Sequence, residues 1–274
     1  MQLFYSSILY NSQSSSDNTN NQSTESNSSS STPKRGKKLP SKIERSGNNS
    51  STGRKNNGKA NAKSTSRGKS IRNKADIKLT SYQKEALIGL LLGDVFAARE
   101  KSSYNTRLVF DQSKDLHSQY IYFLYDLFKA FVGTPPKSPS RKPDRRTGKT
   151  YESLMFKTLR FPCFNEFHDL FYSEGKKTVP LNIKDLFTVV SFAYWIMDDG
   201  GRSTTGGLIL HTNSYTLEEV QLLMSVLTEK FGIVSGTWVR TLGRWAIYIP
   251  KKEMDKVREL VSTFIHPSMN YKIS

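Results

Sequence analysis

The sequence has little with which to build a covalent or zinc-based framework. Its single cysteine, Cys163, excludes a disulfide within the chain and a cysteine-based zinc site. The four histidines lie far apart without ligand spacing, so we expect surface or packing roles for His117, His168, His211 and His266. No apolar run approaches the ~20 residues that cross a bilayer. The first residues have no positively charged start and no small-residue cleavage site, so we expect neither a secretory signal nor an Arg-rich transit peptide.

Residues 1–79 form a segment in which large apolar residues are scarce after residue 10. Residues 11–31 are almost all Ser, Asn, Gln and Thr, and residues 32–79 add Lys, Arg, Gly and Pro. Such a segment cannot bury enough apolar surface to offset its ordering entropy, so we expect a disordered basic low-complexity tail. Residues 1–80 carry 15 Lys/Arg against 4 Asp/Glu, a net +11 of the total +17. The tail is either a solubilising extension or a nonspecific phosphate contact.

From Tyr82 onward the pattern is globular, and it occurs twice. Apolar helices are expected over 80–95 and 185–201, and the apolar run of each ends at an aspartate, Asp94 or Asp199. Each is followed by a strand, an amphipathic helix, a further strand or strand pair, and a closing helix. The strands are expected at 106–113, 151–161, 206–214 and 236–250, and the later helices at 114–131, 164–173, 216–231 and 251–265. We infer a duplication, with repeats at 80–178 and 179–274 and an exposed basic loop at 134–149.

The two apolar helices carry small residues where another backbone can approach, namely Gly89, Gly93, Ser191 and Ala193. A helix that is apolar on every side is expected to be buried. If the two helices pack together, their acidic C-terminal ends lie side by side. Neighbouring carboxylates repel each other unless a cation lies between them, and Mg²⁺ prefers such oxygen ligands. The alternative is two ordinary buried helices whose aspartates cap the next turn.

The segments LIGLLLGDV (87–95) and FAYWIMDDG (192–200) resemble the LAGLIDADG motif in register. Two copies make residues 80–274 similar to the LAGLIDADG homing endonucleases, and closest to the single-chain, two-motif branch encoded in organelle introns. Leu92 and Met197 stand where the consensus has aspartate, which is not the metal position. The resemblance implies an α+β fold of two pseudo-symmetric αββαββα repeats, whose antiparallel sheets form a saddle on the DNA major groove.

The resemblance also implies roles for individual residues. Asp94 and Asp199 would be the catalytic ligands of Mg²⁺ or Mn²⁺, and Lys177 and Lys272 would assist catalysis near the metal. Two residues at strand-to-helix junctions, Gln112 and Asn213, are candidates for positioning water or phosphate. Asp198 either supports the site or is simply exposed. For the lysines, Gln112 and Asn213 the alternative is a solvated surface position.

The expected strands carry polar side chains that suit base edges. These are Arg107, Asp111, Lys157, Arg160, Thr237, Arg240 and Arg244, of which the five basic residues are DNA-binding candidates. A solvated strand face is the alternative for each.

The function that the resemblance implies is site-specific, metal-dependent double-strand cleavage of a long asymmetric DNA target, by a monomer, in support of intron mobility. The alternative is an intron RNA maturase with the same fold, whose partner is the host intron RNA. A third alternative is a nonenzymatic nucleic-acid-binding protein. Both motif carboxylates are present, which favours cleavage. Such proteins are usually encoded in the organelle where they act, so we expect the mitochondrion, with the chloroplast as the alternative.

Overall fold

The computed structural model describes residues 76–241 and 243–274, without the side chains of residues 240 and 241. Thr65–Ser274 forms one compact unit of the chain, and the description below concerns that unit. The tail expected over 1–79 lies outside the described residues except for its last four positions. None of the described helices is both long and apolar enough to cross a membrane.

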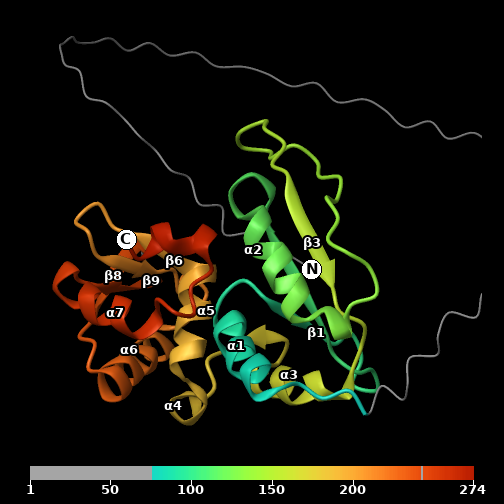
Figure 1. Ribbon diagram of the computed structural model, residues 1–274, viewed down its shortest axis with the longest axis horizontal. Coiled ribbons are helices and arrows are strands. Elements are labelled where there is room, and N and C mark those ends of the chain that lie inside the picture. The colour runs from blue at the N-terminus through green and yellow to red at the C-terminus, as the bar shows by residue number, and fades with distance from the viewer. Residues whose placement is uncertain (1–75, 242) are drawn as a thin grey trace, which may run out of the picture. The chain divides into compact units, whose positions relative to one another are not determined.

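The first repeat begins with an apolar helix and builds a three-stranded antiparallel sheet of order β1-β2-β3 (Figure 1). Its helices are α1 (Ser81–Leu92), α2 (Lys114–Leu127) and α3 (Asn165–Phe171), with short 3₁₀ turns η1 (Lys129–Phe131) and η2 (Pro162–Phe164). Its strands are β1 (Phe96–Ala98), β2 (Arg107–Ser113) and β3 (Ser153–Lys157), followed by the hairpin of β4 (Tyr172–Ser173) and β5 (Lys176–Lys177).

The second repeat has the same order with a fuller, four-stranded antiparallel sheet, β6-β7-β9-β8. Its helices are α4 (Ile183–Leu186), α5 (Val189–Asp199), α6 (Leu217–Phe231) and α7 (Met254–Val261), with η3 (Lys251–Glu253) and η4 (Pro267–Lys272). Its strands are β6 (Gly200–Arg202), β7 (Leu208–Leu210), β8 (Gly236–Thr241) and β9 (Arg244–Ile249).

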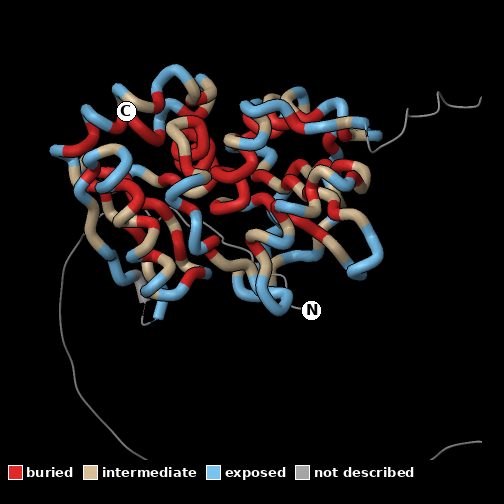
Figure 2. Tube along the Cα trace, turned by 90° about the horizontal axis from the view of Figure 1, so that it is seen from below, coloured by how far each residue is buried: buried red, intermediate tan, exposed pale blue. Residues whose placement is uncertain are grey.

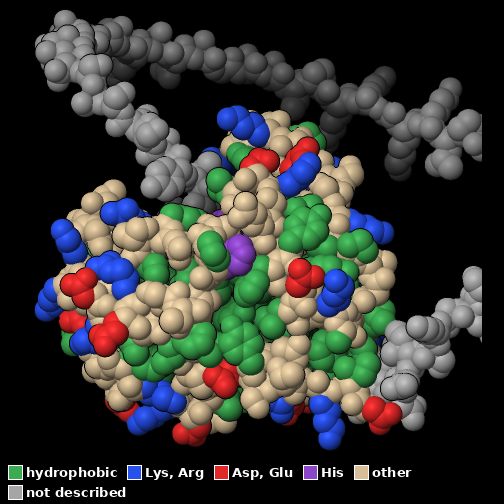
Figure 3. Space-filling view, viewed as in Figure 1, with side chains coloured by type: hydrophobic (Ala, Val, Ile, Leu, Met, Phe, Trp, Pro, Cys, Tyr) green, Lys and Arg blue, Asp and Glu red, His purple; other side chains and the backbone are tan. Residues whose placement is uncertain are grey.

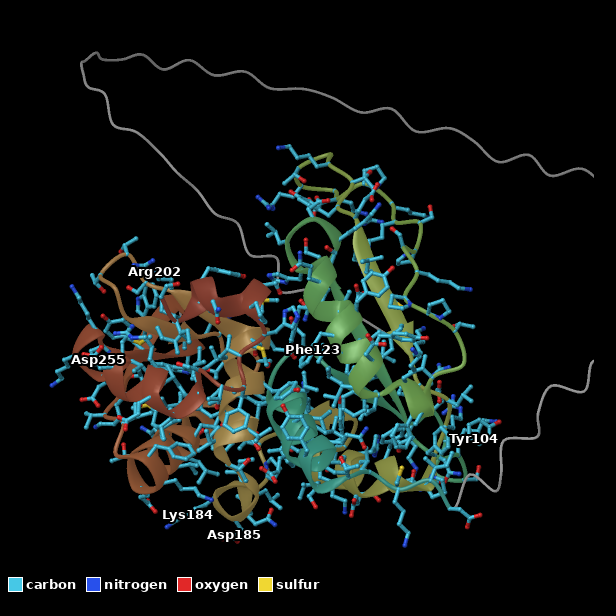
Figure 4. The ribbon with its side chains drawn as sticks, in the orientation of Figure 1. Tyr104, Phe123, Lys184, Asp185, Arg202 and Asp255 are labelled. Carbon is cyan, nitrogen blue, oxygen red and sulfur yellow. The ribbon has the colours of Figure 1, made fainter. Side chains whose placement is uncertain are left out.

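Local chemistry explains where the two apolar helices begin. Thr80 caps α1 as expected, because its hydroxyl accepts the Gln83 backbone N–H (3.1 Å) and the Gln83 side chain accepts the Thr80 N–H (2.9 Å). The helix expected from residue 185 is interrupted. Asp185 belongs to the short α4, away from α5 (Figure 4), and Thr188 caps α5 by accepting the Ser191 N–H. The backbone of Phe187 is extended, so a new helix begins at Val189.

The first sheet lacks a fourth strand because the basic loop at 134–149 does not pair along its length. Isolated bridges join Lys137 to Met155 and Val132 to Thr158. The Arg141 side chain of the loop also bonds to Asp111 of β2 and Ser153 of β3. β3 accordingly ends at Lys157, and Arg160, which was expected in a strand, lies beyond it.

Helices cover one face of each sheet and leave the other face open. In β2, Leu108, Phe110 and Gln112 are buried against α2, while the alternate residues are partly exposed. In the second repeat the register places Leu208 and Leu210 on the same face as Ile249 and Ile247, and this face packs on α6. Buried positions run from both repeats into α1 and α5 (Figure 2), so the two repeats share one core.

Candidate active site

The two apolar helices pack side by side and run in the same direction. Glu85, near the start of α1, bonds to the start of α5: its backbone carbonyl accepts from the Ser191 hydroxyl (2.8 Å) and its carboxylate from Thr188 (2.8 Å). Halfway along, a Cβ added to Gly89 would meet the Ser191 carbonyl oxygen at 2.0 Å, closer than any real contact. Only glycine permits this approach, which accounts for its presence in a helix.

The same close packing continues to the helix ends. A Cβ on Gly93 would lie 2.5 Å from the Asp198 Cβ and 2.8 Å from its Oδ2. Ala193 is fully buried but lies two positions from Ser191. Since residues turn by about 100° along a helix, Ala193 is on the other side of α5. The face of α5 that contacts α1 therefore includes Ser191 and Asp198 but not Ala193.

The parallel packing brings Asp94 and Asp199 to the same end of the helix pair. Asp199 is the last residue of α5 and is half-buried, whereas Asp94 follows the Gly93 cap of α1 and is exposed. The pKa of Asp199 is raised well above its ordinary range, chiefly because protein atoms displace water and then by repulsion from Asp94 and Asp198. Desolvation likewise raises the pKa of Asp94. Both residues keep exposed surface. Their raised pKa values therefore reflect protein atoms crowded around the carboxylates and not complete burial.

Lys177 and Lys272 occupy matching positions at the ends of the two helices. The Lys177 ammonium donates to the carbonyls of Gly93 and Val95 (3.0 Å to the latter), and the Lys272 ammonium donates to those of Met197 and Asp198 (3.0 Å to the latter). Each lysine thus satisfies helix-terminal carbonyls and opposes the negative end of the helix dipole. Desolvation lowers the pKa of both lysines, and the three nearby aspartates oppose that shift.

Asp198 is buried, so of the two alternatives the simply exposed position is wrong. Its carboxylate accepts from the Asp94 backbone N–H (3.1 Å) and the Tyr120 hydroxyl (2.9 Å), and it is only 3% exposed. Burial first, and then repulsion from Asp94, raises its pKa to about 7. The absence of a side chain at Gly93 makes the room that it occupies.

The two junction residues have different surroundings. Gln112 is buried, and its Nε2 lies 3.4 Å from Asp94 Oδ2 and 3.5 Å from Asp198 Oδ1. Asn213 is half-buried, and its Oδ1 has no hydrogen-bond partner within the described part of the chain. A buried polar atom without a partner is costly, and a water molecule or ligand is one way to satisfy it.

The donor set fits a hard divalent cation. Two accessible carboxylates, Asp94 and Asp199, lie in a crowded site where each is destabilised when ionised. Within the described residues no group of three or more His, Cys, Asp or Glu forms a complete metal cage. Mg²⁺ is commonly held by one or two carboxylates while substrate phosphates and water complete its shell. The site therefore suits an ion shared with a phosphate-bearing ligand.

The basic DNA-binding candidates differ in their surroundings. Arg107 and Arg160 converge on Glu100, with Arg107 2.7 Å from its carboxylate, and Arg160 also lies over the Tyr104 ring. Lys157 is exposed on the open face of the first sheet. Arg244 is exposed at the start of β9. Arg240 belongs to β8, but its side chain lies outside the described residues.

Sequence reasoning missed several polar partners of the site. Tyr120 bonds to Asp198, and Tyr215 donates to the Leu92 carbonyl at the end of α1 (3.0 Å). His117, expected to be a surface or packing residue, contacts the side chains of Gln112 and Tyr271. The one available signal was position, because Tyr271 adjoins Lys272 and His117 lies five residues after Gln112, in the first turn of the helix that follows it.

Residues 84–257 match the family model described as the LAGLIDADG DNA endonuclease family. The chain belongs to this family. It is 35% identical over 194 residues to a cytochrome b mRNA maturase bI2 of Debaryomyces hansenii, covering 69% of this chain and 72% of that relative. It is 30% identical over 202 residues to a probable intron-encoded endonuclease 1 of Wickerhamomyces canadensis, covering 71% of this chain and 85% of that relative.

Among solved structures, the chain resembles the homing endonuclease I-WcaI bound to its DNA recognition sequence. The TM-score is 0.67 at 29% identity, covering 72% of this chain and 88% of that one. LAGLIDADG membership and this likeness confirm the resemblance read from the two motifs and the duplicated α+β fold. The helix pair described above is the pair that carries the two LAGLIDADG segments.

Proposed function

We propose that this LAGLIDADG protein is a site-specific homing endonuclease that makes a metal-dependent double-strand cut in DNA. The observation that supports this most strongly is the arrangement at the end of the helix pair. Two accessible carboxylates lie there, and each of two helix termini has a lysine bonded to its carbonyls. The likeness to a homing endonuclease bound to DNA supports the choice of substrate.

Asp94 and Asp199 are the proposed ligands of Mg²⁺, with Mn²⁺ as a substitute. When bound, the ion would lower the pKa of water and stabilise the leaving oxygen of a phosphodiester. Lys177 and Lys272 hold the loops that carry the two carboxylates and place positive charge beside the phosphate. Gln112 and Asn213 are proposed to orient water or phosphate oxygens. Asp198, which is buried, holds the α1 terminus through the Asp94 N–H.

The open faces of the two sheets are the proposed DNA-reading surfaces. β1 starts two residues after Asp94 and β6 starts directly after Asp199, so both sheets continue from the carboxylate end of the helix pair. The opposite side, formed by α1, α2 and α7, shows mostly apolar side chains over its middle, with Lys and Arg toward the edges (Figure 3). The candidate DNA contacts are Arg107, Lys157, Arg160, Arg240 and Arg244.

The proposed division of the chain places the repeats at 80–178 and 179–274. The boundary is supported by a change of partner over three residues: Lys177 bonds to the end of α1, whereas the Val179 N–H donates to Glu219 of α6 (2.9 Å). Two unlike repeats in one chain suit a monomer on a long asymmetric target. We place the protein in the mitochondrion, with the chloroplast as the alternative, as an organelle-encoded product.

A maturase role is the second candidate, because one relative is named a cytochrome b mRNA maturase. RNA binding alone requires no pair of metal carboxylates. A protein with both activities would keep the helix-end site and use another surface for host intron RNA. Binding to the host intron RNA, compared with an unrelated intron, tests this candidate separately.

The test of the nuclease is cleavage of DNA that carries the intron-free junction of the host gene, in Mg²⁺. Asp94→Asn and Asp199→Asn are each expected to bind this DNA yet lose double-strand cutting, because the amide is a poor metal ligand. Asp126→Asn, at an exposed position in α2, is the matched control and should cut normally. Normal cutting by either motif variant would remove these two residues from the proposed site.

A further inference from the structure

One buried histidine near the site has no part in the proposed reaction. His117, near the start of α2, is 8% exposed and lies between two polar side chains. Its Nδ1 is 2.9 Å from Gln112 Oε1 and its Nε2 is 3.0 Å from the Tyr271 hydroxyl. On its other side, Gln112 presents Nε2 to Asp94 and Asp198. The residues involved come from β2, α2, η4 and the carboxylate end of the helix pair.

The chemistry of the end groups gives this chain of bonds a direction. Ionised carboxylates only accept, so the Gln112 amide nitrogen faces them and its carbonyl oxygen is left for His117. His117 Nδ1 must then donate, which leaves Nε2 as the acceptor of the Tyr271 O–H. A neutral imidazole satisfies both requirements. Burial, aided by the positive charge of Lys272, lowers the His117 pKa to about 4 and keeps the ring neutral.

The second repeat has no equivalent arrangement. His117 lies five residues after Gln112, and the residue five after Asn213 is Glu218. Tyr271 precedes Lys272, and the residue that precedes Lys177 is Lys176. Glu218 and Lys176 are both exposed. The Asn213 Oδ1 has no hydrogen-bond partner in the described residues, whereas the Gln112 Oε1 is held by an imidazole. The amide in one half of the site is therefore fixed by protein, and its counterpart is not.

We propose that His117 and Tyr271 are positioning residues that fix the Gln112 amide toward Asp94 and Asp198, so that cleavage of one DNA strand depends on them more than cleavage of the other. This inference rests on the proposed nuclease function. Outer-shell partners of metal ligands commonly contribute 10- to 100-fold to activity. Because the bonds reach only one junction residue, their loss should not affect both strands equally.

The test uses the full chain and a supercoiled plasmid carrying the intron-free junction, with each strand end-labelled in parallel linear substrates. His117→Ala is expected to slow one strand roughly 10- to 100-fold more than the other, so that nicked circles accumulate. Tyr271→Phe removes only a hydroxyl from an exposed residue and should slow the same strand by a smaller factor. DNA affinity should stay within about twofold, because neither side chain lies on an open sheet face.

Two further variants separate positioning from damage to the fold. His117→Asn keeps an N–H near the place of Nδ1 and should recover most of the rate that His117→Ala loses. Tyr122→Phe, at a similarly exposed position on α2, should leave both strands unchanged. Equal slowing of the two strands, opposite strand bias in the His117 and Tyr271 variants, or no recovery by asparagine would overturn the proposal. If the wild-type chain cuts neither strand, the proposed function fails instead.

Discussion

At the scale of single residues, burial determines which state of a titratable group the fold accepts. The His117 pKa of about 4 in the folded chain is below the ordinary value of about 6.5. Between these values the unfolded chain takes up a proton that the folded chain does not, so stability is lost as the pH falls. The positive charge of Lys272 opposes protonation further.

We therefore expect the free energy of unfolding of the wild-type protein to fall, relative to His117→Asn, as the pH is lowered from about 6.5 to about 4. Urea denaturation at several pH values, without divalent metal, measures this. The aspartates of the site titrate in both proteins, so the difference isolates the imidazole. A constant difference across this range would mean that His117 is protonated as easily in the fold as in the unfolded chain.

The residues that sequence analysis brought together are those fixed by the repeat. Asp94, Asp199, Lys177 and Lys272 stand at equivalent positions of two similar segments, so packing the segments predicts that they meet. The burial of Asp198 and the contacts of His117 with Tyr271 could not be predicted this way. They depend on side chains as much as 154 residues apart. The motif position of the first repeat that matches Asp198 is Gly93, which has no side chain.

At the scale of elements, the α1–α5 contact sets the positions of both carboxylates. Gly89→Ala would place a methyl group 2.0 Å from the Ser191 carbonyl oxygen, which is backbone and cannot rotate away. Overpacking costs up to about 3 kcal/mol and the better helix propensity of alanine returns about 1, so we expect a net loss of about 2 kcal/mol. The helices must also part, so cutting should fall while DNA binding persists.

Gly236→Ala is the matched control, because an added Cβ at the start of β8 meets no atom within 4 Å. Denaturant unfolding of both variants gives the comparison of stability, and plasmid cleavage by Gly89→Ala is compared with that of the wild-type chain. Equal stability of the two variants would show that the helices tolerate a wider separation than their contact implies.

The elements themselves were predictable to different degrees. The capped helices α1 and α6 lie within one residue of their expected starts, since Thr80 and Thr216 each form a capping box. The expected second-motif helix was interrupted, because an apolar run does not reveal that one helix ends before Phe187 and that Thr188 caps the next. The first sheet was harder to predict in detail, since the pairing of the loop at 134–149 depends on tertiary contacts.

At the scale of the whole described unit, the two repeats meet through more than the motif helices. Phe123 of α2 packs between Tyr194 of α5 and His266 of the C-terminal segment, with ring centroids 6.2 and 4.8 Å apart (Figure 4). η4 then supplies Tyr271 and Lys272 to the site. The C-terminal segment of the second repeat thus bonds to the first, so each half of the site depends on both repeats.

The two open sheet faces differ in chemistry, which bears on how the molecule reads an asymmetric target. On the first face the register aligns Lys157 with Val109 and Phe96, beside Arg107 and Asp111. On the second face it aligns Trp238, which is 46% exposed, with Ala246, next to Tyr248. Charged side chains suit phosphates and guanine edges, whereas apolar ones suit thymine methyl groups.

We therefore expect Lys157→Ala and Trp238→Ala to weaken DNA binding in different ways. Loss of the lysine charge should reduce the salt slope of the binding constant by about one, whereas loss of the indole should lower affinity and leave the slope unchanged. Fluorescence anisotropy between about 50 and 200 mM salt measures the slopes. Hybrid targets, with one half-site scrambled at a time, should assign the two effects to opposite halves. If both variants change the slope equally, or both effects map to the same half, the two faces do not read separate half-sites.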